Sequence, residues 1–330
     1  MFANNRLAVA TLFGGLVASY ICSASDEATS DERRDEAYLR VQRLRAEIDL
    51  LRVEMGCERA KPLPLHFANA SRHDVHYQVR ILVEKLQRLA EEWGQEVVPA
   101  PNDDLYDAQQ RELSPLLDAA QRRVESLKAA VGVEHVSPPA PHVTGEHVAG
   151  EQVTEDELFE AVVAANRQIN RLFDAAFAPR DVYRQVTVCV AYASSLLAPF
   201  PSATRIPPEP AFEHAKRPTD VFRRLLECYD ILHGTCARRR ISILEIRAEG
   251  PIDSVAPSEV YDLAGLLASQ LARLDGLVNH QPTTRCWYTP GRKLPSHVFQ
   301  RVGLLERQLL ELDAHVDDNP QWPNLRLQLP

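Results

Sequence analysis

Pro179-Arg180-Asp181-Val182-Tyr183 is the first of four similar stretches that recur along the C-terminal half of the chain. The other three are Pro218-Thr219-Asp220-Val221-Phe222, Pro257-Ser258-Glu259-Val260-Tyr261 and Pro295-Ser296-His297-Val298-Phe299. Their valines lie 39, 39 and 38 residues apart, and such a regular period indicates internal repetition. A proline at the first helical position, a polar or acidic residue in the first turn and an apolar residue after it are typical of a helix N-terminus. We therefore predict that a helix begins at each stretch.

Two further helix starts lack the proline and carry a side-chain cap instead. Ser71 is followed three residues later by Asp74, and Thr154 is followed in the same way by Glu157. In such a capping box, the two side chains accept hydrogen bonds from backbone N–H groups that have no partner inside the helix. Helices are therefore expected to begin after Ser71 and after Thr154.

Apolar residues follow the helix starts at alternating steps of four and three residues. The last helix shows this pattern at Val298, Val302, Leu305, Leu309, Leu312 and Val316. The spacing places apolar side chains on one helix face, as in helices packed at a shallow angle. No run lasts beyond about three heptads, which disfavours a long two-stranded coiled coil. The predicted helices lie near residues 36–56, 72–93, 104–131, 155–177, 179–198, 218–233, 257–279 and 295–316.

The predicted fold class is all-α, with helical bundles built from repeated modules of about 39 residues in the C-terminal section. Its connectors are long and rich in proline, as between Pro199 and Arg217. A helix of about 18 residues spans roughly 27 Å, and an extended chain of about 8–9 residues covers the same distance. Such connectors can run back along the helix that they follow and allow the repeated helices to lie parallel. Ile241–Ile246, with a short strand, and Cys286–Tyr288 are expected to cover outer helix faces.

The chain divides by composition into six segments. Residues 1–24 have the layout of a signal peptide, with an apolar stretch and small residues before the acidic Asp26 and Glu27. An uncleaved membrane anchor at 7–24 is the alternative. The other segments are a mobile polar lead-in at 25–35, an N-terminal helical section at 36–135, a Pro/His/Gly linker at 136–153, a C-terminal helical repeat section at 154–318 and a Pro-rich tail at 319–330.

The charge balance and the leader constrain partners and compartment. The formal net charge is −9, and no basic run is longer than Arg238-Arg239-Arg240, so we expect no nucleic-acid partner. No second long apolar segment follows the leader, so membrane contact is expected only through the leader, if it stays uncleaved. The predicted location is periplasmic or secreted.

Five cysteines lie beyond the leader, and their pairing stays open. They are Cys57, Cys189, Cys228, Cys236 and Cys286. An odd number without C-x-x-C spacing is weak support for a disulfide framework. Cys189 and Cys228 fall on apolar helix faces, where a small buried side chain is the favoured interpretation. A Cys236–Cys286 bridge between two connectors is the alternative in an exported protein.

The sequence contains no catalytic or cofactor-binding motif, and we predict no catalytic, cofactor or metal site. His66, His73 and His76 fall close together, but a metal would need a further ligand such as Asp74 or Glu84. We expect these histidines to be solvated, and the same holds for the linker histidines. The linker histidines are His142 and His147.

An aromatic residue follows the apolar residue at most of the helix starts. These aromatics are Phe159, Tyr183, Phe222, Tyr261 and Phe299. They could line a ligand groove, but because the same residue type recurs in every unit, packing against the connectors is favoured.

These features together predict a non-enzymatic, exported helical-repeat protein that acts as an interaction scaffold or adaptor for a protein partner in the cell envelope. The alternative is a periplasmic small-ligand binding or sensory module, with a pocket between helices lined by Tyr183, Tyr261 and Trp287.

Overall fold

The computed structural model describes residues 30–59, 65–95, 113–133, 135–136, 152–173, 177–250, 252–279, 291–318 and 322. Several predicted features lie outside these ranges: the leader, most of the linker, Cys286, Trp287 and most of the tail. The elements are α2 (Ser30–Glu54), β1 (Leu65–Ala68), α3 (Arg72–Glu92), α4 (Ser114–Ala130), α5 (Glu155–Ile169), α6 (Pro179–Leu196), α7 (Pro218–Arg238), β2 (Glu245–Ala248), α8 (Pro257–Asn279), α9 (Pro295–His315) and the short 3-10 helix η2 (Val316–Asp318). The all-α prediction is confirmed at this level.

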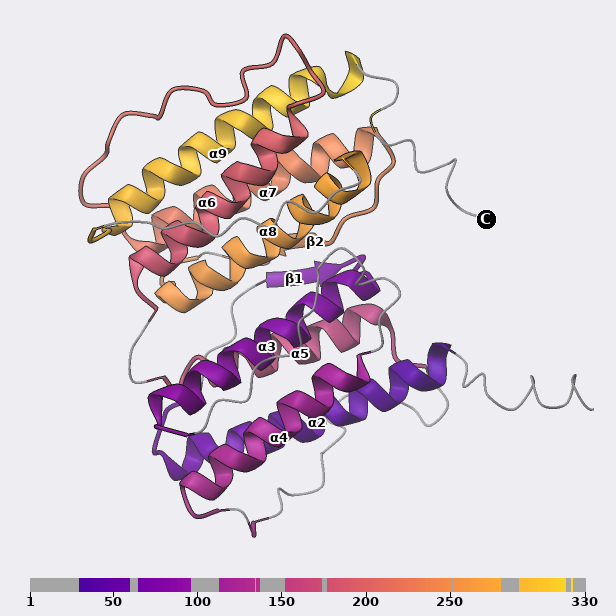
Figure 1. Ribbon diagram of the computed structural model, residues 1–330, viewed down its shortest axis with the longest axis vertical. Helices are drawn as coiled ribbons and strands as arrows, with labels where there is room; N and C mark the ends of the chain where they lie inside the picture. The colour runs from indigo at the N-terminus through magenta and orange to yellow at the C-terminus, as the bar shows by residue number, and fades with distance from the viewer. Residues whose placement is uncertain are drawn as a thin grey trace, which may run out of the picture.

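The helices form two four-helix bundles, α2 to α5 and α6 to α9, which Figure 1 shows one above the other. In the first bundle α2 and α3 each pack against α4 and α5. In the second bundle α6 and α7 each pack against α8 and α9. In each bundle, the first and second helices therefore lie diagonally opposite each other across the core, and so do the third and fourth helices.

Helix α5 belongs to the first bundle, which differs from the expected division of the chain. The composition of residues 136–153 suggested a boundary there, with the helix after Thr154 in the C-terminal section. In the structure α5 packs against α2 and α3, and the chain passes to the second bundle only after α5. The physical reason is that the apolar face of α5 completes the core of α2, α3 and α4. A linker-like composition therefore indicates an irregular connection between helices, but it does not show where one bundle ends and the next begins.

All four helices of a bundle run in the same direction. In the second bundle, the backbone N–H of Lys216 donates to Ser296 Oγ (3.2 Å) near the starts of α7 and α9. Thr235 Oγ1 donates to Asp313 Oδ1 (2.5 Å) near their ends. In the first bundle, the N–H of Ala70 donates to the Asp156 side chain (2.6 Å) near the starts of α3 and α5.

The long connectors make this parallel arrangement possible, as predicted from their length. The connector after α6, however, runs back along α9 and not along α6, the helix that it follows. Its contacts descend through Thr204–Glu311, Arg205–Gln308, Pro208–Arg307, Glu209–Arg301 and Pro210–Gln300. In the next connector Ile241, Ile243 and Leu244 are buried in the core, so this apolar patch covers helices as expected.

Each helix of the second bundle begins at the proline of its sequence stretch, and the third helical residue caps the N-terminus. The N–H of Ala178 donates to Asp181 Oδ2 (3.0 Å), and the N–H of Arg217 donates to Asp220 Oδ2 (2.8 Å). The remaining two pairs are Ala256–Glu259 (2.8 Å) and Leu294–His297 (3.1 Å, to Nδ1). The predicted capping boxes at Ser71 and Thr154 are also present.

The boundaries of α2, α5 and α7 differ from the prediction, and α7 continues to Arg238 instead of ending near residue 233. Helix α2 begins at Ser30, inside the segment expected to be a mobile lead-in, and Arg34 holds this turn by binding the Asp31 carboxylate (2.8 Å) and the Val153 carbonyl. Helix α5 ends at Ile169 and not near 177. Leu172 is nevertheless buried, because a turn after the helix carries it back to the core.

A two-stranded antiparallel ribbon lies between the bundles (Figure 1). Phe67 of β1 pairs with Ile246 of β2, and both side chains are buried. The strand predicted around Ile241–Ile246 is therefore shifted to Glu245–Ala248, because pairing with β1 decides its position. β1 itself was not predicted, since its partner is about 180 residues away in the sequence. No helix in the described ranges is long and apolar enough to cross a membrane.

Candidate functional site

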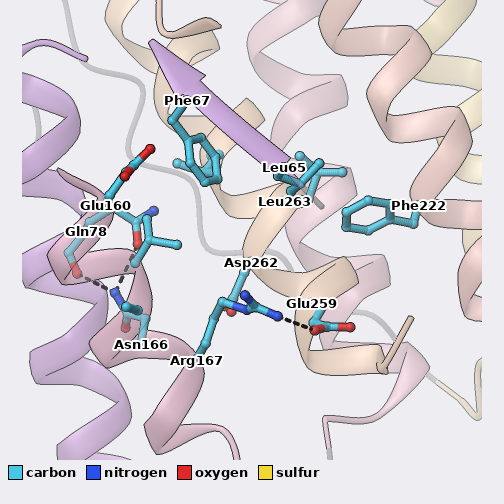
Figure 2. A pocket seen from close by; sticks show the side chains of 13 residues that line it. Leu65, Phe67, Gln78, Glu160, Asn166, Arg167, Phe222, Glu259, Asp262 and Leu263 are labelled. Carbon is cyan, nitrogen blue, oxygen red and sulfur yellow. Dashed lines mark hydrogen bonds and ion pairs between the residues drawn. The ribbon is translucent and has the colours of Figure 1, made fainter. Parts of the chain in front are cut away.

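A cavity of about 220 Å³ lies where the two bundles meet, beside strand β1 (Figure 2). Helix α5 and β1 provide most of its first wall, with Gln78 from α3, and α8 provides most of the second wall, with Phe222 from α7. The lining residues are Leu65, Phe67, Gln78, Glu160, Val163, Ala164, Asn166, Arg167, Phe222, Glu259, Asp262, Leu263 and Leu266. The two bundles therefore share one site.

Apolar side chains form most of the surface of this cavity. Phe67 is held in place by an edge-to-face contact with the buried Phe159, with ring centroids 5.3 Å apart. Figure 2 shows Phe67 on β1 and Phe222 on the opposite bundle, with Leu65 and Leu263 between them. Phe222 has no solvent exposure, so the cavity reaches the core of the second bundle.

An ion pair between Arg167 and Glu259 joins the two walls. Arg167 Nη2 lies 3.0 Å from Glu259 Oε1, and both side chains are largely buried. The other carboxylate oxygen of Glu259 accepts the hydrogen bond from the Ala256 N–H that caps α8. Glu259 therefore both starts α8 and fixes α5 against it. Figure 2 shows Arg167 extending from α5 toward this carboxylate.

A second and more deeply buried ion pair stands behind the cavity. Lys85 Nζ lies 2.6 Å from Asp262 Oδ1, and the Lys85 side chain is only 4% exposed. Asn170 donates to the other Asp262 oxygen at 2.8 Å. Burial lowers the pKa of Lys85, and the Asp262 carboxylate opposes this shift. The negative charge of Asp262 is thus matched by a cation of the first bundle.

Asn166 is held by two hydrogen bonds at the junction of α3 and α5. Its amide nitrogen donates to both the backbone carbonyl and the side-chain oxygen of Gln78, at 3.0 Å each. Because both partners are acceptors, the orientation of the Asn166 amide is determined. The pair fixes the polar end of the first wall.

Glu160 differs from the other two carboxylates of the lining because it is exposed and has no hydrogen-bond or ion-pair partner among the described residues. Partial burial nevertheless raises the pKa of Glu160. His66 opposes this shift, while the acidic residues nearby add to it. These acidic residues are Asp156, Glu157 and Glu249.

The structure overturns the expectation that His73 and His76 are solvated, whereas His66 is exposed. His73 Nε2 lies 2.9 Å from Ser269 Oγ in the interface between α3 and α8. Burial lowers the pKa of His73 to about 4. The two histidines of α3 are buried because the polar side of α3 packs on α8. The apolar pattern of α3 shows its contacts inside the first bundle and does not show this additional contact with the second bundle.

The aromatic side chains at the helix starts are mainly packed, as favoured by their recurrence. Phe159 and Phe222 are fully buried, and Tyr183, Tyr261 and Phe299 pack against the core. Tyr261 stacks on Phe177 with centroids 4.7 Å apart. The alternative pocket lined by Tyr183, Tyr261 and Trp287 is not the observed cavity, and Trp287 lies outside the described residues.

Cys189 and Cys228 are buried, as their positions on apolar helix faces indicated, and Cys236 lies within α7 and not in a connector. Cys57, Cys189, Cys228 and Cys236 are free thiols, and the last three are buried. Burial raises the pKa of each of these three thiols. Cys286 lies outside the described residues, so its pairing with Cys236 stays a hypothesis. Within the described part of the chain, no group of His, Cys, Asp and Glu side chains is arranged to hold a metal ion.

Comparison with protein families, with curated proteins and with solved structures finds no match to this chain. The cavity is therefore the feature of the molecule that indicates a function. Its charged residues were missed by sequence reasoning. Lys85, which stands behind the cavity, could have indicated a buried charged site from the sequence. It lies between the apolar residues Leu82 and Leu86, on a side of the helix that is otherwise strongly apolar.

Proposed function

We propose that this protein is a non-enzymatic binding module that takes a small, largely apolar molecule into the cavity between its bundles. The cavity supports this proposal, because it has apolar walls and a few fixed polar groups, as ligand sites commonly do. Both bundles contribute to the walls. A bound molecule would therefore contact both and favour one relative placement of them.

The proposed setting is the periplasm or the exterior of the cell. Support comes from the signal-peptide layout of residues 1–24. We further propose that α6 to α9 arose from one repeated module of about 39 residues. The four proline starts and their shared third-residue caps support this origin.

Thermal unfolding with a set of small aromatic and aliphatic compounds tests the binding proposal. A molecule that binds only the folded protein stabilises it by about 1.4 kcal/mol at ten times its Kd. Ala164→Phe, which fills the cavity, should abolish the shift in Tm. Ala237→Phe adds the same side chain at an exposed site on α7 outside the cavity and should preserve it. Equal shifts in both variants would place binding elsewhere.

The second candidate function is an interaction scaffold of the cell envelope. It is favoured by Leu39 and Val53, which are 55% and 57% exposed on α2. They are 14 residues apart, and this spacing puts them on nearly the same side of the helix. Affinity purification from the native host should recover a specific protein with the natural chain and lose it with the Leu39→Glu/Val53→Glu variant. Recovery that is the same with both chains would speak against this surface.

A further inference from the structure

The charges around the cavity are balanced except at one position. Arg167 is the only basic residue among the described residues of its lining, and it is paired with Glu259. Asp262 is matched by Lys85 and is also bound by Asn170. The carboxylate of Glu160 remains without such a match. Figure 2 shows it on the α5 side of the cavity, away from the Arg167–Glu259 pair.

We propose that the ligand of this cavity carries an amine or a similar cationic group beside its apolar part, and that the cation is bound by Glu160. This inference rests on the proposed binding function and specifies the chemical class of the ligand. The apolar part would lie against Phe67, Val163 and Leu266, and the cation would face the exposed end of the α5 wall.

The surroundings of Glu160 favour a cation over an anion. The charged groups that act on the pKa of its carboxylate are His66 of β1, Asp156 and Glu157 of its own helix, and Glu249 after β2. Three of these four groups are acidic, so the local field attracts cations and repels anions. An anionic ligand would also have to displace Glu259 from Arg167, and that would remove an ion pair and the cap of α8 together.

The size of the cavity suits a small molecule. Its volume of about 220 Å³ exceeds the roughly 150 Å³ of an apolar cavity that binds benzene, so one ring with a short chain fits inside. We therefore assign the site to small aryl-alkyl or alkyl amines.

Calorimetric titration of the full chain with three probes of similar shape tests this assignment. The probes are 2-phenylethylamine, the neutral 2-phenylethanol and the anionic 3-phenylpropanoate. The amine should bind about fivefold more tightly than the alcohol, which is the upper range for an exposed ion pair, and the acid should bind least tightly. Glu160→Gln should bring the amine to the affinity of the alcohol and leave the alcohol unchanged.

Glu227→Gln provides the matched control, because it removes the same charge from an exposed site on α7 outside the cavity. It should keep the preference for the amine. Equal affinity of amine and alcohol for the natural chain would overturn the cationic class, while binding of either would leave the proposed function intact. Failure of all three probes to bind would overturn both. A preference that survives Glu160→Gln would also overturn the role of Glu160.

The pH dependence of binding gives an independent readout. Only the ionised carboxylate of Glu160 attracts the amine, which stays protonated through the weakly acidic range. Amine affinity should therefore increase as the pH rises through the raised pKa of Glu160, while alcohol affinity stays constant. A flat amine profile would contradict the assignment.

Discussion

Among single residues, Gly303 of α9 leaves space that the guanidinium of Arg224 occupies. A Cβ atom built at Gly303 would lie 2.5 Å from Nη2 of Arg224. In this position the Arg224 guanidinium binds Glu306 through Nε (2.8 Å) and donates to the Phe299 carbonyl (3.2 Å). It also lies 4.5 Å from the centroid of the Phe299 ring. The glycine thus allows α7 and α9 to share a cation at close approach.

We predict that the effect of Gly303→Ala on the free energy of unfolding has opposite signs in the natural chain and in a chain that carries Arg224→Ala. In the natural chain it should lower the free energy of unfolding by about 1 kcal/mol, because lost charge-assisted hydrogen bonds (about 1.5–3 kcal/mol) outweigh the gain in helix propensity (about 1 kcal/mol). In an Arg224→Ala background it should raise stability by about 1 kcal/mol. Urea unfolding of the four proteins measures this cycle. Equal effects in both backgrounds would show that Arg224 does not restrict this site.

His73 makes a second prediction at this scale, through its pKa of about 4 in the folded state. The unfolded chain binds a proton at this histidine near pH 6.5, whereas the folded chain does not until about pH 4. The contribution of His73 to the free energy of unfolding is therefore fully present above pH 6.5. As the pH falls toward 4, the free energy of unfolding decreases by about 3 kcal/mol. His73→Gln should remove this part of the pH slope. Unfolding curves at pH 4 and pH 7 compare the two proteins, and an identical slope would contradict the shift.

At the scale of secondary-structure elements, the third residue of each helix in the second bundle is a cap. Asp220 caps only α7, whereas Glu259 caps α8 and also binds Arg167. We predict that Asp220→Ala lowers stability by about 1 kcal/mol. Glu259→Ala should lower it by about 2–3 kcal/mol, since it also leaves a largely buried arginine without this partner. The Arg167→Ala background should reduce the Glu259→Ala effect to that of Asp220→Ala. Thermal unfolding measures each change, and equal effects of the two single substitutions would contradict a double role for Glu259.

At the scale of the whole molecule, the two bundles meet through polar groups of α3 and α8, which run in opposite directions. Asp74 accepts from Gln270, His73 contacts Ser269, and Lys85 pairs with Asp262. This interface is buried, so its polar groups stabilise the molecule only while their partners stay in register. Together with the β1–β2 ribbon, they hold the walls of the cavity at a fixed separation.

The Lys85–Asp262 pair tests this coupling between bundles. Lys85→Met should lower the free energy of unfolding by about 3 kcal/mol, because it leaves Asp262 beside the cavity without its cation. The double variant Lys85→Met/Asp262→Leu should recover most of that loss, since replacing both partners removes the unmatched charge. Urea unfolding followed by circular dichroism gives the comparison. A double variant that is no more stable than Lys85→Met would show that the pair does not act as a unit.

The local structure of this protein could be predicted from its amino-acid sequence. The proline starts, the caps at Ser71 and Thr154 and the four-three apolar spacing are interactions within one helix, so they can be read without the rest of the chain. The length of the connectors likewise allowed parallel helices. Their sequence did not reveal which helices are neighbours, because an apolar face fits any similar face.

The grouping of the helices and the composition of the site depend on packing between distant parts of the chain. Helix α5 joined the first bundle, β1 found β2 across most of the chain, and His73 was buried by α8. The cavity combines Glu160 and Arg167 of α5 with Glu259 and Asp262 of α8. These residues are brought together by packing between bundles, and such contacts depend on three-dimensional complementarity, which leaves no periodic signal in the sequence.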